Sequence, residues 1–183
     1  MGDPRKARKT YSRPRSPWRA DQLAQELYLL GTFGLRNKRE LWKAQTHLST
    51  VRKQARTLLA ATQQVWLREE KKLLTSLNRQ GLVVDGAALD DILNLTVEDV
   101  LGRRLQTLVF KKGMAISPLH ARQLVVHGHV VIGERSITVP GYLVRREEEG
   151  SIKLTGLKAP EAPAGAVPAP VPEQNAAEAV APE

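Results

Sequence analysis

The amino-acid sequence predicts an α+β protein, in which an α-helical N-terminal half precedes a small domain of two short helices packed on a small antiparallel sheet. Apolar residues recur at helical spacing between residues 20 and 79. Helix-capping pairs follow between residues 96 and 128, and short β-branched runs around turns occupy residues 129–154. Because the helices come first and the strands last, the order is that of an α+β chain.

The composition indicates a polyanionic partner. The 183 residues include 28 Lys and Arg against 19 Asp and Glu, a formal net charge of +9. The absence of cysteine excludes a disulfide framework, a thiol nucleophile and a cysteine-ligated zinc site. No apolar run reaches the roughly 18 residues of a membrane span, and no signal-peptide stretch follows the basic N-terminus. We therefore expect an intracellular protein that binds nucleic acid.

The two ends of the chain differ in charge. Residues 1–19 are strongly basic and contain three prolines, so we expect a basic arm that becomes ordered against phosphates; the alternative is a solvated terminus. Residues 156–183 are acidic and rich in Ala and Pro, which predicts a disordered tail without chemistry. Between them we expect a helical domain at 20–95 and the small domain at 96–155.

Local signals predict where the first helices begin and end. Asp21 is expected to cap a helix that ends at Gly31. Asn37 and Glu40 have capping-box spacing and are expected to open a second helix.

The apolar positions that follow do not decide whether residues 38–79 form one helix or two. They continue through residues 63–79, which is compatible with one bent helix or with two. A connector follows at residues 82–95, with a short helical segment around residues 89–93.

The small domain has clearer boundaries. Thr96 and Asp99 have capping-box spacing, and the helix that they open is expected to have Lys111 and Lys112 in its last turn, with Gly113 just beyond. Ser117 followed by a proline predicts the start of another helix, which Gly128 ends.

Short strands are expected after these helices. Residues 129–139 are typical of a hairpin that turns at Gly133, where Gly133-Glu134 suits a type II′ turn. Residues 142–144 and 152–154 are further candidate strands.

The residues of this small domain carry a resemblance. Arg103–Ala115 and Ser117–Val130, above all the run Ala-Arg-Gln-Leu-Val-Val-His-Gly, resemble the RNA-binding domain named after ribosomal protein S-four. The opening Met-Gly-Asp-Pro-Arg-Lys, Asn37–Trp42, Arg52–Arg56 and Asp91–Asp99 resemble the archaeal form of that small-subunit ribosomal protein family. Some relatives carry a cysteine zinc site near the N-terminus, and many carry Asn-Gly in the hairpin; this chain has neither. We therefore expect no metal and no cofactor.

The resemblance implies a structural constituent of the cytoplasmic small ribosomal subunit. Such a protein binds small-subunit rRNA directly, nucleates assembly and contributes to translational accuracy. The expected partners are that rRNA, neighbouring ribosomal proteins (the S-five family first) and messenger RNA near its entry path. The alternative is a ribosome-biogenesis factor that binds precursor rRNA and leaves before maturation. The sequence shows no nucleophile elbow, metalloprotease motif or phosphate-binding glycine loop, so we expect no enzyme.

Charge and the resemblance together predict the residues that contact RNA. Lys and Arg neutralise phosphates, a serine at a helix N-terminus sits beside free N–H groups, and Gln and His can bond to a base or a ribose. If the two short helices pair, their cations are expected to form one basic face. The predicted residues are Arg5, Lys6, Arg8, Lys9, Arg13, Arg15, Arg52, Lys53, Arg56, Arg103, Arg104, Lys111, Lys112, Ser117, His120, Arg122, Gln123, His127 and His129.

Some of these residues also fit purely structural roles. Lys111 and Lys112 complement the dipole at a helix end, and His127 can bond to a free helix-end carbonyl. Trp42 and Trp66 are expected to anchor the core and not to stack on bases.

Overall fold

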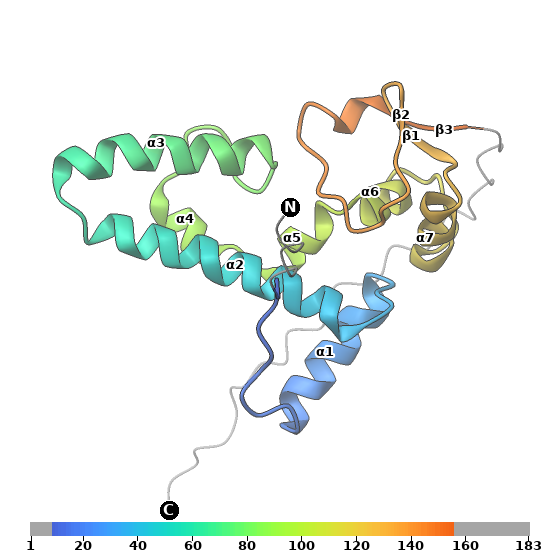
Figure 1. Ribbon diagram of the computed structural model, residues 1–183, viewed down its shortest axis with the longest axis horizontal. Helices are drawn as coiled ribbons and strands as arrows, with labels where there is room; N and C mark the ends of the chain where they lie inside the picture. The colour runs from blue at the N-terminus through green and yellow to red at the C-terminus, as the bar shows by residue number, and fades with distance from the viewer. Residues whose placement is uncertain (1–8, 156–183) are drawn as a thin grey trace, which may run out of the picture.

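The computed structural model describes residues 9–155, apart from the side chains of residues 63–65 and 67, and confirms the α+β class. In Figure 1, α2 and α3 lie side by side, α1 lies below the start of α2, and the sheet lies with α6 and α7 at the upper right. The elements are α1 (Ala20–Thr32), α2 (Lys38–Leu59), α3 (Gln63–Arg79), α4 (Leu89–Asn94), α5 (Val97–Gly102), α6 (Leu105–Lys111), α7 (Pro118–Val126), β1 (Val130–Ile132), β2 (Arg135–Ser136), a 3₁₀ turn η1 (Glu149–Ser151) and β3 (Ile152–Leu154).

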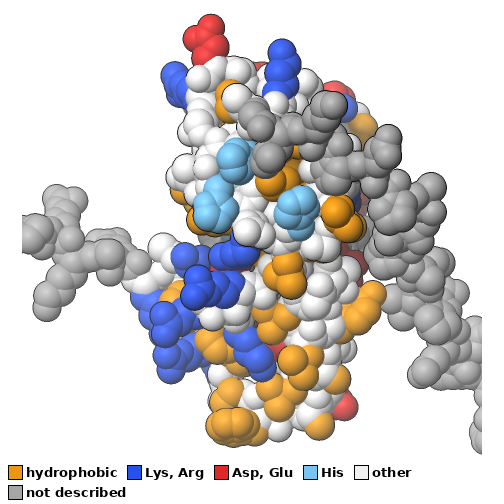
Figure 2. Space-filling view, turned by 90° about the vertical axis from the view of Figure 1, so that its right-hand side faces the viewer, with side chains coloured by type: hydrophobic (Ala, Val, Ile, Leu, Met, Phe, Trp, Pro, Cys, Tyr) orange, Lys and Arg blue, Asp and Glu red, His pale blue; other side chains and the backbone are white. Residues whose placement is uncertain are grey.

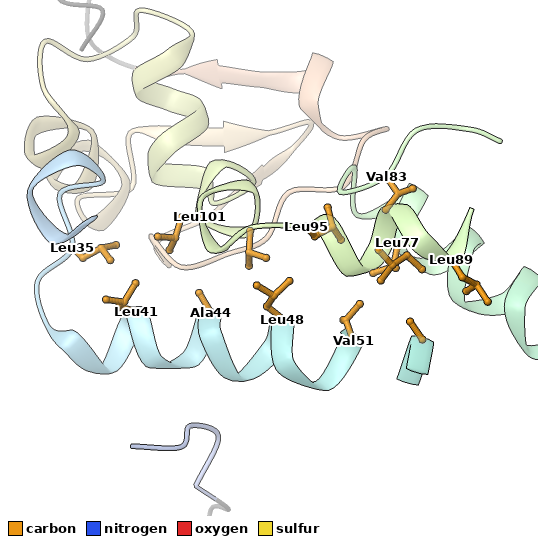
Figure 3. Close-up of a cluster of buried hydrophobic side chains, with 13 residues drawn as sticks. Leu35, Leu41, Ala44, Leu48, Val51, Leu77, Val83, Leu89, Leu95 and Leu101 are labelled. Carbon is orange, nitrogen blue, oxygen red and sulfur yellow. The ribbon is translucent and has the colours of Figure 1, made fainter. Parts of the chain in front are cut away.

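One face of α2 organises the first hydrophobic core. Its buried residues, Leu41, Ala44, Leu48, Val51 and Ala55, are three or four apart and therefore lie on one side of the helix. Figure 3 shows Leu41, Ala44, Leu48 and Val51 pointing toward side chains from α3, α4 and α5. Each fully buried leucine contributes about 2 kcal/mol of hydrophobic stabilisation. This face therefore holds the helical half together.

A second core lies under the sheet. Residues from α6, α7 and β1 form it, among them Leu105, Val109, Val125 and Val130, each fully buried. The strand order is β2-β1-β3, with both pairings antiparallel. Short helices packed on one face of a small antiparallel sheet are the architecture predicted for the small domain.

The linker between α2 and α3 decides between one helix and two. The α-helical hydrogen bonding stops after Leu59 and resumes at Gln63, so residues 63–79 form a separate helix. Among the described helices, none combines the length and apolar composition that crossing a membrane requires.

Two predicted helix starts are wrong in detail. Asp21 lies inside α1, whose N-cap is Arg19, and that helix continues one residue past Gly31. The N-cap of α2 is Asn37, as expected, but its side chain makes no capping hydrogen bond. Glu40 forms no capping box because its carboxylate binds two arginines instead. A charge-assisted pair outweighs a bond to a backbone N–H.

The helix expected from Val97, with Lys111 and Lys112 in its last turn, is broken into α5 and α6. Arg104 is extended, with φ −71° and ψ 143°, and pairs with Leu143 in an isolated antiparallel bridge. Tertiary pairing therefore overrides the helical pattern at this point. The same bridge is all that forms at residues 142–144, so the strand expected there is absent.

Other local predictions are confirmed. The Thr96 side chain accepts from the backbone N–H of Asp99, and Ser117 caps α7 by accepting from the N–H of His120 at 3.1 Å. In the hairpin, Ile132 pairs with Arg135, which leaves Gly133 and Glu134 as the two turn residues. Gly133 has φ +62°, and no non-glycine residue in the described part has positive φ, as a type II′ turn requires.

Candidate nucleic-acid interface

The N-terminal arm rests on α2. Arg5, Lys6 and Arg8 lie outside the described residues. Farther along, the Tyr11 ring stacks on the Trp42 indole at 6.0 Å between centroids, and the Ser12 N–H donates to Thr46 Oγ1 at 3.0 Å. The Lys9 ammonium lies 5.0 Å from the centre of the Tyr11 ring. This part of the arm therefore has contacts without RNA, contrary to the expectation that RNA alone orders it.

A basic hollow of about 520 Å³ lies between this arm and the start of α2. Its cations are Arg13, Lys38 and Arg39, and the Trp42 indole forms an apolar wall. No carboxylate from the described part of the chain lines it. Lys38 is paired with the buried Glu26 at 3.0 Å, which leaves Arg13 and Arg39 as the cations most available to a phosphate. We call this site the arm hollow.

The charge around the arm hollow acts on Tyr11. Hydrogen bonding from Arg13 lowers the pKa of the Tyr11 hydroxyl; burial opposes this effect, and the charges of Arg39 and Lys9 add to it. Figure 2 shows Lys and Arg side chains gathered on one side of the face that carries α1 and α7. A local excess of positive charge of this kind attracts phosphate.

Two arginines predicted to contact RNA bind a carboxylate of the protein. Arg122 Nη2 lies 2.8 Å from Glu40 Oε1, and Arg104 Nη2 lies 2.7 Å from Glu40 Oε2. The Arg104 side chain is only 8% exposed. Burial alone would raise the pKa of Glu40, but hydrogen bonds and charge from Arg122 and Arg104 lower it. Both guanidiniums therefore join α2 to the small domain.

Two further predicted contacts have internal partners. Arg103 donates to the carbonyls of Gln80 and Val144 and forms an ion pair with Glu149 at 2.7 Å. Arg52 donates to the carbonyl of Leu95. The single basic face expected from the two short helices is therefore not formed, because Arg103, Arg104 and Arg122 are held by acceptors within the chain.

The remaining predicted residues lie at several places on the surface. Ser117 accepts from the N–H of His120, and the Nδ1 of His120 accepts from the N–H of Ile116 at 3.3 Å. The His127 and His129 rings lie 6.4 Å apart, so the structure brings these two together near the end of α7. Lys112 donates to the carbonyl of Glu149. The exposed residues are Lys9, Arg13, Arg15, Lys53, Arg56, Lys111, Lys112, Gln123 and His127.

Sequence reasoning missed part of the arm hollow. Lys38 and Arg39 are not among the predicted residues, although they open a predicted helix directly beside Asn37. Their position could have indicated a site. Cations in the first turn of a helix interact unfavourably with the helix dipole, so their presence there suggests another interaction that compensates. Trp42 is half-buried under Tyr11, a long-range contact without a local signal.

The chain is similar in sequence to one protein family and to several known proteins. The S4 domain family matches residues 103–149, which include α6, α7 and the hairpin. The small ribosomal subunit protein uS4 of Cenarchaeum symbiosum is 58% identical over 156 residues, which cover 85% of this chain and 76% of that protein. The chain belongs to the uS4 family. The uS4 protein of Ignicoccus hospitalis is 56% identical over 81% of this chain and 90% of its own length.

A third uS4 protein also matches most of the chain. The uS4 protein of Methanothermobacter thermautotrophicus is 49% identical over 83% of this chain and 89% of its own length. These relatives confirm the resemblance to the archaeal form of the family.

Proposed function

We propose that this uS4-family chain is a structural component of the small ribosomal subunit and binds small-subunit rRNA directly. The observation that carries the proposal is the pairing of an S4 domain with the arm hollow, a cationic site whose described lining holds no carboxylate. The formal net charge of +9 supports a polyanionic partner. A structural role of this kind needs no catalytic group.

Phosphate neutralisation is the proposed source of affinity. Arg13 and Arg39 in the arm hollow and the exposed Lys111 and Lys112 are the cations best placed to bind phosphates. Gln123, exposed on α7, offers an amide to a base edge or a ribose hydroxyl. Arg103, Arg104 and Arg122 are paired within the chain and support RNA binding indirectly, because they fix the shape of the protein. They hold the two hydrophobic cores, which we propose as two domains, in one orientation.

A ribosomal protein also contacts its neighbours, and one surface suits that role. Exposed apolar side chains include Leu27 and Tyr28 on α1 and Leu119 and Val126 on α7. Figure 2 shows hydrophobic side chains spread over this face, apart from most of the cations. We propose a protein neighbour here, for which the family resemblance favours the S-five protein. By the same resemblance, we propose contact with messenger RNA near its entry path, a part in early assembly and an effect on translational accuracy.

Co-sedimentation tests the proposed function. The tagged chain should be present once per mature small subunit and should stay bound through a high-salt wash that strips loosely associated factors. Presence in precursor particles alone would show a biogenesis factor and contradict the proposal. In a purified system, the chain should bind folded small-subunit rRNA more tightly than an unstructured RNA of equal length.

A further inference from the structure

A groove separates α2 from the loop formed by residues 139–143. Its volume is about 690 Å³, within the range of roughly 300–1,000 Å³ typical of ligand pockets. Ala44, Val100 and Leu143 form an apolar floor, and Lys43, His47 and Arg104 add polar groups. The arm hollow shares none of these residues, so the groove is a separate site.

Two buried polar atoms in the groove have no hydrogen-bond partner among the described residues. Arg104 is 7% exposed, and its Nε–H has no acceptor among the described residues. His47 Nδ1 is likewise buried without a partner in the described part of the chain. Nearly all buried polar atoms in native proteins are hydrogen-bonded, so each of these two atoms needs a partner, which a bound ligand can supply. These two atoms come from α2 and from the start of α6, on opposite sides of the groove.

The charge of the groove favours an anion. Three cations line it, Lys43, Arg104 and Arg122, while Glu40 is the one carboxylate among the described residues of its lining. Glu40 balances one of the two guanidiniums that it binds, which leaves a positive excess. Lys43 is exposed on α2, at the opening of the groove. A ligand with a flat apolar part and a negative charge matches this combination.

We propose that the groove receives one unpaired nucleotide of the bound RNA. Its base lies on the apolar floor, its edge bonds to Arg104 and His47, and its phosphate binds Lys43. Folded RNA displays unstacked bases at loops and bulges, and proteins recognise them by their hydrogen-bonding edges. This proposal rests on the proposed function, since it requires rRNA as the partner.

Filling the groove tests the proposal without changing any charge. Thr50 and Val139 line it from opposite sides, and both are exposed, so Thr50→Trp and Val139→Trp occupy the groove without disturbing a core. Ser49→Trp is the matched control, because Ser49 is exposed on the same helix but does not line the groove. The probe is full-length, folded small-subunit rRNA, and the full protein chain is used. Thermal melting checks that each variant folds.

Each filling variant should weaken binding about tenfold, the loss expected for one displaced base, and Ser49→Trp should change binding less than twofold. The dependence of binding on salt should stay the same in all three variants, because every phosphate keeps its cation. Lys43→Gln should instead lower the salt dependence by about 0.7 in log–log slope, the value for a single-stranded phosphate. Equal binding by wild type and both folded filling variants would overturn the proposal.

Photocrosslinking identifies the occupant. A photoreactive phenylalanine analogue at position 143, on the groove floor, should crosslink to one unpaired nucleotide in assembled small subunits. A crosslink to a ribosomal protein or to base-paired RNA would overturn the nucleotide proposal and leave the proposed function intact. Failure of the wild-type chain to bind the rRNA at all would contradict the proposed function itself.

Discussion

Arg122 on α7 binds Glu40 on α2 through both of its terminal nitrogens, at 2.8 Å to Oε1 and 3.1 Å to Oε2. The two residues are 82 positions apart in the chain. Arg104 donates to the same carboxylate, and Arg122 Nη1 also lies 3.4 Å from the Gln106 side-chain oxygen. One glutamate therefore fixes the S4 domain against the longest helix of the other core.

Removing the Glu40 charge should destabilise the whole chain. In Glu40→Gln, Arg104 and Arg122 lose their counter-charge, and Arg104 stays buried. We expect a loss of about 3 kcal/mol in the free energy of unfolding, as for other broken buried pairs. Urea denaturation measures it, with the exposed hairpin substitution Glu134→Gln as the control, expected within about 0.5 kcal/mol of wild type. Identical transitions for wild type and Glu40→Gln would show that the pair adds no stability.

The same pair should make stability depend on pH. Burial tends to raise the pKa of Glu40, but Arg122 and Arg104 lower it below its ordinary value of 4.5. A pKa lowered by folding means that the unfolded chain takes up the proton more readily. The stabilisation is therefore complete above about pH 4.5 and is lost as the pH falls through the lower folded pKa.

Melting temperatures between pH 7 and pH 3 measure this effect. The difference in melting temperature between wild type and Glu40→Gln should be largest at neutral pH and should become smaller in acid. Glu26, whose pKa is also lowered because Trp42 and Lys38 outweigh its burial, is present in both proteins and cancels in the comparison. A gap that stays constant down to pH 3 would contradict the assignment to Glu40.

Features encoded by neighbouring residues could be predicted from the sequence. The Thr96–Asp99 capping box, the Ser117 cap and the turn at Gly133 each depend on residues within three or four positions of one another. Residues 63–79 form a helix with the expected bounds for the same reason.

Features that depend on distant partners could not be predicted. The break between α5 and α6 follows from the pairing of Arg104 with Leu143, 39 positions later. For the site, the charge pattern predicted cations at Arg104 and Arg122 but gave no sign that both bind Glu40; their contact with RNA stays a prediction. The exposure of Lys111, Lys112 and Gln123 agrees with the helical pattern; their contact with RNA stays a prediction.

Gly34 should tolerate no side chain. It has φ +58°, and a Cβ there would lie 2.7 Å from the Pro118 Cβ and 3.0 Å from Gln106 Nε2. We expect Gly34→Ala to cost about 3 kcal/mol, because backbone strain and a clash add together. Gly86→Ala separates the two effects: Gly86 has φ +85° but open space around it, so strain alone should cost about 1 kcal/mol. Equal losses in urea denaturation would mean that the contact with Pro118 relaxes freely.

The arm hollow should set much of the salt dependence of RNA binding. Arg13→Gln combined with Arg39→Gln removes two cations from it. The log–log slope of binding against salt should become shallower by about 0.9 for each phosphate that these variants no longer neutralise. Arg68→Gln, on the exposed surface of α3, removes one charge elsewhere and should leave the slope unchanged. Filter binding to folded rRNA at several salt concentrations measures the slopes of wild type and both variants, and equal slopes would place the phosphate-binding cations outside the arm hollow.

Charge and shape should contribute separately at the small domain. Lys111→Ala with Lys112→Ala should weaken binding to every RNA alike, since an ammonium on a flexible stem responds to charge. Gln123→Ala should instead reduce the preference for native rRNA over a generic duplex, because an amide makes contacts of fixed direction. Gln123 is the clean position for this test, since its neighbour Arg122 holds Glu40 and its loss would also disturb the fold. Competition between the two RNAs at one salt concentration measures the preference. If Gln123→Ala lowers affinity for both RNAs equally, Gln123 does not recognise RNA shape.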